Sequence, residues 1–246
     1  QWQPIGFDDS HYFSGNFDGG CHSITLYLFT NSNYVGLFGY INGSSICNLN
    51  LHGKIKSNTS PSIGSKVGLI GYISSSSVYN CTNYCNIELN NNNAAQAGGI
   101  GGYIIFSTIV NCANRGTIMS QHSGNACGGI CGYARHVKIY RSYNVGNLSC
   151  SSSNCGGIIG YVQSYWFDTV VVSNCYNTGD ISSSESGYIG GICSYISQGQ
   201  LTNCYNIGTL YTATNRYGIA PLPVSNCYYL NTCGQNIPSG GSSYGG

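Results

Sequence analysis

One five-residue motif recurs along the chain at nearly constant spacing. It consists of Gly, an aliphatic residue, a variable residue, Gly and Tyr, and its clearest copy is Gly157-Ile158-Ile159-Gly160-Tyr161. A period of about 30 residues, built from short apolar runs without a helical pattern, predicts a solenoid of β-strands. The first glycines of the copies, the last one degenerate, are Gly36, Gly68, Gly99, Gly129, Gly157, Gly191 and Gly218.

A second motif follows each copy of the first by about ten residues. Its clearest copies, 172–181 and 201–210, contain Asn-Cys-Tyr-Asn followed by Gly and an aliphatic residue. We expect three short strands per coil: the Gly-Tyr strand, the strand that ends at Asn-Cys, and one around the closing aliphatic residue. This predicts an all-β fold, a parallel β-helix of about seven to eight coils with right-handed crossovers. Residues 1–35 would form an N-terminal capping coil, 36–230 the repeats, and 231–246 a Gly/Ser-rich tail or linker.

Stacked coils align equivalent residues about 4.8 Å apart, so each position becomes a ladder. We expect a structural tyrosine ladder, in which replacing Tyr161 by Ala costs about 3 kcal/mol if the ring is buried and well below 1 if it faces solvent. In the exposed case the ladder would become a surface for glycans. Stacked amides should hydrogen-bond along the axis. The predicted ladders are Tyr40, Tyr72, Tyr103, Tyr133, Tyr161 and Tyr195, and Asn83, Asn114, Asn144, Asn177 and Asn206.

The fourteen cysteines form an even set, which is typical of an oxidising, extracellular setting. Five of them recur at one position of the coil, and we expect buried thiols there, because side chains in register run parallel and suit a disulfide poorly. These five are Cys81, Cys112, Cys175, Cys204 and Cys227. The candidates for disulfides, with the pairing left open, are Cys127, Cys150, Cys155, Cys227 and Cys233.

Charge is scarce: 6% of residues are charged and the formal net charge is +1. Nucleic acid is therefore excluded as a partner, since phosphate binding needs clustered Lys and Arg. A hydroxyl- and amide-rich surface suits self-association, other surface proteins or glycans. No apolar run approaches the length of a membrane span, and no signal peptide is recognisable, so we expect a mature extracellular or cell-surface chain, or a fragment of one. Candidate glycosylation sites are Asn42, Asn58 and Asn147.

The two motifs together resemble the GLUG-type repeats of secreted and surface proteins. The resemblance covers about residues 13–230 and includes the lead-in Phe17-Asp18-Gly19. It implies a β-solenoid in an extracellular or cell-surface protein, often as a module of adhesin-like chains. It implies no catalytic residue, because the repeat of that family carries none. The high Cys and Tyr content departs from the bacterial members of the family.

Catalytic chemistry on a β-helix needs paired carboxylates or acidic clusters on one face. We expect the column that contains Asp180 to hold Lys54, Glu88, Thr117, Asn147 and Thr209 as well, so no acidic ladder forms. We interpret the group Asp8, Asp9, His11, Asp18 and His22 as turn residues, with a Ca²⁺ or catalytic site as the alternative. We interpret the group Arg135, His136, Lys138 and Arg141 as a solvated corner, with a sulfated or uronic glycan site as the alternative.

The sequence therefore predicts no enzymatic activity and no cofactor. It predicts a structural or adhesive extracellular repeat protein that can self-assemble into a filament or surface layer. The alternative is a carbohydrate-binding or carbohydrate-active β-helix.

Overall fold

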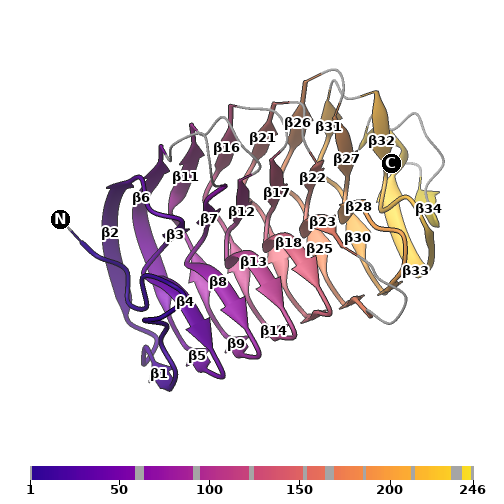
Figure 1. Ribbon diagram of the computed structural model, residues 1–246. Helices are drawn as coiled ribbons and strands as arrows, with labels where there is room; N and C mark the ends of the chain where they lie inside the picture. The colour runs from indigo at the N-terminus through magenta and orange to yellow at the C-terminus, as the bar shows by residue number, and fades with distance from the viewer. Residues whose placement is uncertain are drawn as a thin grey trace.

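The computed structural model describes residues 2–58, 64–90, 95–121, 125–151, 154–163, 169–184, 187–211, 214–233 and 240–244. The chain winds into parallel β-coils stacked side by side, with the N-terminus and the C-terminus at opposite ends of the stack (Figure 1). Every strand pairing among the described residues is parallel, and the single helical element there is a 3-10 turn at Asn231–Cys233. The predicted parallel β-helix is confirmed, with about six full turns between partial coils at the two ends. The handedness of its crossovers stays a prediction.

Four sheets run along the solenoid, and sheets A and D meet at the Gly-x-x-Gly motif. Sheet A contains β4 (Phe38–Asn42), β8 (Ile70–Ser74), β13 (Gly101–Ile105), β18 (Cys131–Arg135), β23 (Ile159–Val162) and β28 (Cys193–Tyr195). Sheet D contains β3 (Tyr34–Val35), β7 (Lys66–Val67), β12 (Gln96–Gly98), β17 (Ala126–Gly128), β22 (Asn154–Gly156), β27 (Tyr188–Gly190) and β32 (Asn215–Tyr217).

Sheets B and C form the rest of each coil. Sheet B contains β1 (Asn16–Asp18), β5 (Ser45–Cys47), β9 (Ser77–Tyr79), β14 (Thr108–Val110), β19 (Lys138–Tyr140), β24 (Val171–Ser173), β29 (Gln200–Thr202) and part of β33 (Pro223–Leu230). Sheet C begins with β2 (Ser23–Thr30) and β6 (Asn50–Ser57) and ends with the rest of β33 and with β34 (Gly240–Tyr244). Between them lie β10 (Thr82–Asn83), β11 (Asn86–Leu89), β15 (Ala113–Asn114), β16 (Ile118–Ser120), β20 (Tyr143–Asn144), β21 (Leu148–Cys150), β25 (Tyr176–Asn177), β26 (Ile181–Ser183), β30 (Tyr205–Asn206) and β31 (Leu210–Tyr211).

A middle coil thus has five short strands, where the sequence predicted three. The additional strand of sheet D, such as Ala126–Gly128, precedes the first glycine of the motif and is too short and too small in its side chains to show an alternating pattern. The closing strand is divided in two after the buried asparagine.

The core is a set of aliphatic columns that run along the axis. In sheet B the inward column is buried throughout, and its members follow one another in register: Ile46, Val78, Ile109, Ile139, Val172 and Leu201. The aliphatic residue after each first glycine is buried in the same way. Each Å² of apolar surface buried along these columns contributes about 25 cal/mol, and this burial is the main term that stabilises the fold.

The glycines of the motif are required by close packing at the bend between sheets D and A. A Cβ atom on Gly129 would lie 2.2 Å from the carbonyl oxygen of Gly157 and 2.4 Å from the Cβ of Asn144. The first glycine therefore lets the chain pass directly against the buried asparagine ladder of sheet C.

Candidate functional site: a tyrosine face

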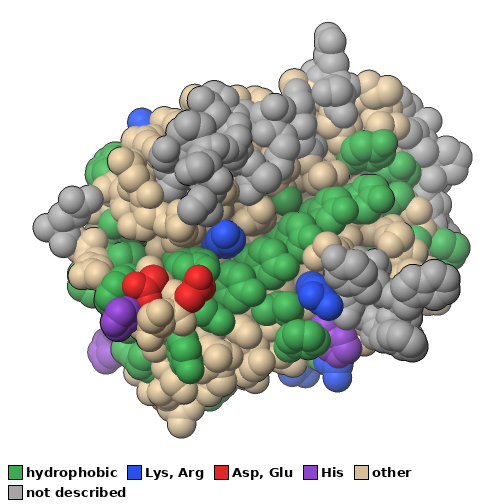
Figure 2. All heavy atoms as spheres, in the orientation of Figure 1, with side chains coloured by type: hydrophobic (Ala, Val, Ile, Leu, Met, Phe, Trp, Pro, Cys, Tyr) green, Lys and Arg blue, Asp and Glu red, His purple; other side chains and the backbone are tan. Residues whose placement is uncertain are grey.

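The predicted tyrosine ladder exists, and it lies on the outside of sheet A. In each strand of sheet A the tyrosine is half-buried, except Tyr195, which is 39% exposed. From Tyr40 to Tyr161 the next residue of the strand is buried in the core. Successive ring centroids, taken from Tyr40 to Tyr195, are 4.7, 4.9, 4.6, 5.1 and 4.7 Å apart. Figure 2 shows a row of hydrophobic side chains running across this side of the molecule. We call these six residues and the columns beside them the tyrosine face.

Two columns flank the stack. On one side lie the outward residues of sheet D, which are in register as Tyr34, Lys66, Gln96, Ala126, Asn154 and Tyr188. Tyr34 contacts Tyr40, and Tyr188 contacts Tyr195, which places this column directly beside the stack. On the other side, two residues after the first four tyrosines, lie Asn42, Ser74, Ile105 and Arg135. The face is therefore aromatic and hydrogen-bonding, with little charge.

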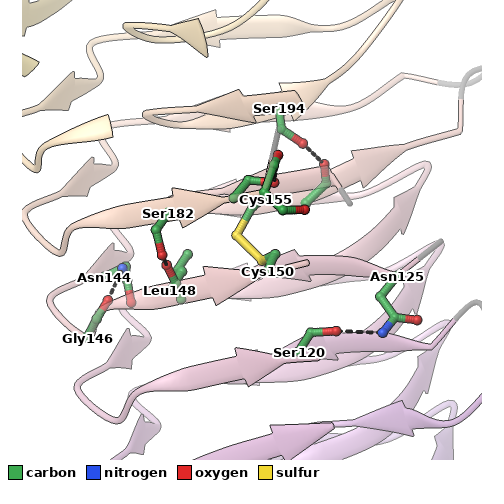
Figure 3. Close-up of a disulfide and its surroundings, with 12 residues drawn as sticks. Ser120, Asn125, Asn144, Gly146, Leu148, Cys150, Cys155, Ser182 and Ser194 are labelled. Carbon is green, nitrogen blue, oxygen red and sulfur yellow. Dashed lines mark hydrogen bonds between the residues drawn. A yellow bond between two sulfur atoms is a disulfide. The ribbon is translucent and has the colours of Figure 1, made fainter. Parts of the chain in front are cut away.

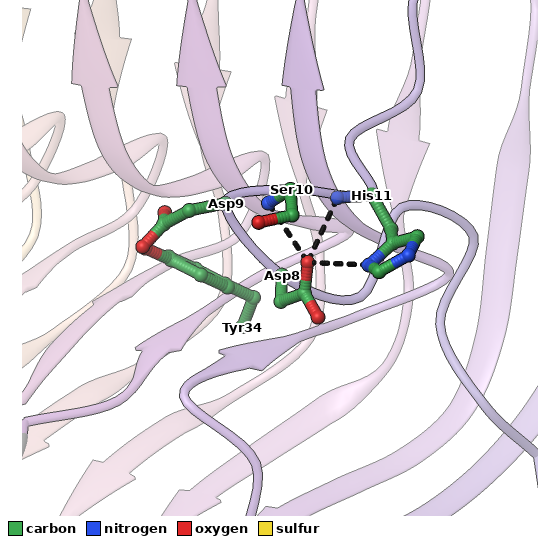
Figure 4. A network of polar contacts seen from close by, with 5 residues as sticks. All are labelled: Asp8, Asp9, Ser10, His11 and Tyr34. Atoms are coloured by element: carbon green, nitrogen blue, oxygen red, sulfur yellow. Dashed lines mark hydrogen bonds and ion pairs between the residues drawn. The ribbon is translucent and has the colours of Figure 1, made fainter.

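The N-terminal segment closes one end of the face. The hydroxyl of Tyr34 donates to Oδ1 of Asp9 at 2.5 Å, and Figure 4 shows the two side chains together. Burial, and next the bond to Asp9, raise the pKa of Tyr34, while burial raises that of Tyr72 to about 12. Burial lowers the pKa of Lys66, whose Nζ lies 5.5 Å from the centroid of the Tyr34 ring. Sequence reasoning placed Asp9 in a turn and missed its contact with Tyr34, because the two residues are 25 positions apart and joined by an irregular segment.

The predicted basic group does not form one site. The Arg135 guanidinium lies over the Phe106 ring, 5.9 Å from its centroid, on the side of sheet A. Lys138 belongs to sheet B, and Arg141 occupies the corner after that strand, where its Nε donates to Oδ1 of Asn111 at 3.0 Å. Only Arg135 therefore borders the tyrosine face.

The five predicted ladder asparagines are fully buried and chained by their amides. Each Nδ2 donates to Oδ1 of the next asparagine, at 2.8, 2.8, 2.7 and 2.8 Å from Asn83 to Asn206. Each Nδ2 also donates to the carbonyl oxygen two residues later in its own coil, as Asn144 does to Gly146. These amides are structural, because they satisfy backbone groups at the break in sheet C.

A second amide ladder runs along the corner between sheets B and C, where every member has a positive φ between 48° and 56°. Asparagine tolerates this left-handed conformation better than most residues. Its amides donate in the opposite direction, toward the N-terminal end: Asn80 donates to Asn48, and Asn48 donates to Asp18. Arg141 continues the ladder with its Nε.

A second tyrosine stack lies on sheet C and was not predicted. Rings of Tyr143, Tyr176 and Tyr205 are stacked at 4.8 and 4.9 Å with nearly parallel planes. The Arg115 guanidinium donates to the Tyr143 hydroxyl at 2.9 Å. The recurring tyrosine of the Cys-Tyr-Asn motif was the available signal for this stack.

The cysteines mostly serve as core residues. The five recurring cysteines are buried and free, as predicted. Of the disulfide candidates, Cys150 and Cys155 are bonded, with Cα atoms 6.3 Å apart, whereas Cys127, Cys227 and Cys233 are free thiols. Figure 3 shows the disulfide near the Ser120–Asn125 hydrogen bond of the neighbouring coil. Burial raises the pKa of Cys127 to about 12, which leaves that thiol protonated and unreactive at neutral pH.

The acidic residues serve turns and ladders. Oδ1 of Asp8 accepts from the backbone N–H groups of Ser10 and His11 and contacts Nδ1 of His11 (Figure 4), and Asp18 accepts from the N–H of Gly20. The prediction that Glu88 belongs to the column of Asp180 is wrong. Glu88 lies opposite Lys56, and Asn86 occupies the position in the Asp180 column. Within the described residues no three His, Cys, Asp or Glu side chains gather as a metal site would require.

The candidate glycosylation residues lie at different depths. Asn58 and Asn147 are exposed and Asn42 is half-buried, and Oδ1 of Asn147 accepts from the N–H of Asp180 at 3.0 Å. Their modification stays a prediction. Among the described residues no helix has the length and apolar character to cross a membrane.

The comparisons with known proteins show the fold. No family model matches the chain, so the resemblance to GLUG-type repeats stays a prediction, and no curated protein sequence matches it. A solved structure from Bacteroides ovatus, named a "putative immunoglobulin A1 protease", is similar over 89% of this chain and 72% of its own, with 21% identity and a TM-score of 0.67. A second, named "IgA1 Protease", is similar over 81% of this chain but only 17% of its own, with 19% identity and a TM-score of 0.53.

These neighbours correct one expectation. The sequence predicted a protein without enzymatic activity. That prediction is wrong, because both of these solved structures that share the fold are named as proteases. The absence of an acidic ladder excluded one glycan-cleaving arrangement and did not bear on other chemistries. At these identities the likeness establishes the β-helix and not its activity.

Proposed function

We propose that this chain is a recognition module of an extracellular or cell-surface protein, and that the tyrosine face is its contact surface. One observation carries the proposal: six tyrosines stand in an unbroken, half-exposed stack on a rigid sheet. Tyrosine supplies large contact area together with a hydrogen-bonding group at a low cost in conformational entropy. Because each ring is already held in place by its neighbours, binding costs little further side-chain conformational entropy.

The scarcity of charge and the resemblance to surface-protein repeats support an adhesive role. In the solved structure named "IgA1 Protease" the similar region is only 17% of that protein's own chain, so such a solenoid also occurs within a much longer protein. Contact with a second copy of the chain is a competing use of the same face, and the experiment below separates the two.

The test compares the two tyrosine stacks. The labelled chain is applied to an array of extracellular glycans and matrix proteins, beside the variants Tyr103→Ala/Tyr133→Ala and Tyr176→Ala/Tyr205→Ala. We expect signals that vanish in the first variant and persist in the second, whose stack has the same spacing on another sheet. Signals unaffected by the first variant, or a wild-type chain that binds only itself, would contradict the proposal.

A further inference from the structure

The geometry of the tyrosine face points to its ligand class. We propose that it binds an acidic polysaccharide lying along the solenoid axis, and that the phenol hydroxyls, not the ring faces, recognise it. This inference rests on the proposed function above.

The orientation of the rings is the first step. From Tyr72 to Tyr195 the successive interplanar angles are 5°, 14°, 24° and 0°, so each inner ring is covered on both faces by its neighbours. A ligand on this face meets ring edges and hydroxyl groups. Stacking of a sugar or an aromatic ring on a tyrosine face is therefore excluded along the middle of the ladder, and hydrogen bonding is left as the main attraction.

The spacing is the second step. One tyrosine per coil repeats every 4.6 to 5.1 Å along the axis. An extended polypeptide presents side chains on one face about 6.6 to 6.8 Å apart, twice its rise per residue, and falls out of step within two coils. An extended polysaccharide advances by roughly one sugar ring per coil and presents hydroxyl groups at that interval. The ladder therefore favours a sugar polymer over a peptide strand.

The flanking columns give the charge preference. Among the described residues of these two columns, Lys66 and Arg135 are the only charged side chains, and they stand two coils apart on opposite sides of the stack. The remaining polar positions include the half-buried Asn42 and Ser74, which can hydrogen-bond sugar hydroxyls, whereas the amide oxygens of Gln96 and Asn154 are buried. At the N-terminal end Asp9 would repel an anionic ligand, which places the polymer over the coils of Tyr72 to Tyr161.

The first experiment tests the hydroxyl groups. Isothermal titration calorimetry measures binding of a linear polyuronate hexamer to the wild type, Tyr103→Phe/Tyr133→Phe and Tyr103→Ala/Tyr133→Ala. Phenylalanine keeps the ring stack and removes two hydroxyls, so we expect affinity to fall about tenfold while circular dichroism still shows the folded β-helix. If the phenylalanine variant binds like the wild type while the alanine variant does not, the tyrosine face stands as a contact surface and hydroxyl recognition is refuted.

The second experiment tests the charge. We expect Lys66→Gln and Arg135→Gln each to weaken polyuronate binding about threefold and to leave binding of a neutral glucan hexamer unchanged. The matched control Lys138→Gln removes an exposed lysine from sheet B and should change nothing. Three results would each overturn the inference: a wild type that binds no polyuronate, one that binds the neutral hexamer equally well, or one that binds poly-L-glutamate as tightly as the polyuronate.

Discussion

Replacing Asn144 by alanine removes the middle rung of the buried asparagine ladder. The Asn144 amide donates to Oδ1 of Asn177 at 2.7 Å and to the carbonyl oxygen of Gly146 at 2.8 Å, and its own Oδ1 accepts from Asn114 at 2.8 Å. After the substitution two acceptors, Oδ1 of Asn177 and the oxygen of Gly146, lose these donors in a region closed to water. The Asn114 amide keeps its bond to Gly116, but its second N–H, which donated to Asn144, is left without an acceptor.

The magnitude follows from the two acceptors and the one donor that lose their partners. A buried polar group left without its partner costs about 1–3 kcal/mol, so the free energy of unfolding should fall by about 3–9 kcal/mol. That is a large part of the roughly 5–15 kcal/mol that stabilises an ordinary domain. Urea denaturation followed by circular dichroism measures the loss. Asn206→Ala should cost less, because Asn206 donates along the axis only to the Cys233 sulfur, at 3.5 Å.

The matched control lies in the exposed amide ladder. Asn174 occupies a corner with a φ of 56°, which glycine adopts readily, so Asn174→Gly should cost less than about 1 kcal/mol. If Asn144→Ala costs as little as Asn174→Gly, the buried amides do not hold the coils together. The stability would then have to come from the aliphatic columns alone.

Four further outcomes are expected. Gly129→Ala should lower the melting temperature strongly by calorimetry, because its Cβ would meet the carbonyl oxygen of Gly157 at 2.2 Å; a mild effect would show that the coils can separate there. Tyr161→Ala should cost about 1–2 kcal/mol in urea denaturation, less than a buried ring, and a cost near 3 would make the stack part of the core. Between the ordinary tyrosine pKa of 10.0 and the folded value of about 12, the unfolded phenol loses its proton while Tyr72 keeps it. Stability should therefore fall as pH rises through that window, and an ultraviolet titration of the folded protein that shows only ordinary phenols would contradict this. Cys150→Ser should lower the unfolding free energy by about 2 kcal/mol in urea denaturation, and an unchanged value would show that the Cys150–Cys155 bond does not stabilise the fold.

The sequence predicted the elements whose side chains repeat strictly. The Gly-Tyr motif located sheet A, and the Asn-Cys motif located the corner after sheet B together with the buried asparagine ladder. The buried cysteine column was predicted because parallel side chains in register do not favour a disulfide.

What could not be predicted depends on distance across the coil. The strands of sheet D are two or three residues long and consist largely of small side chains, so they carry no period. The exposure of the tyrosine stack depends on the strands of sheet D beside it, and only the folded coil brings these next to sheet A, as it brings Tyr34 against Tyr40 and Tyr72. The Asp9 contact comes from an irregular segment that no repeat describes. The structure places the tyrosine stack on the surface and not in the core, so its role in binding can be tested.

The direction of the buried amide ladder has a consequence for the length of the molecule. Each inner asparagine accepts a hydrogen bond from the coil before it and donates one to the coil after it, so a duplicated coil would fit between any two rungs without orphaning an amide. The asparagine column is bounded in register by Leu51 on one side and Tyr229 on the other. Between these two positions the solenoid can gain or lose whole coils without leaving a buried amide unpaired. A change by part of a coil would interrupt the chain of amide hydrogen bonds.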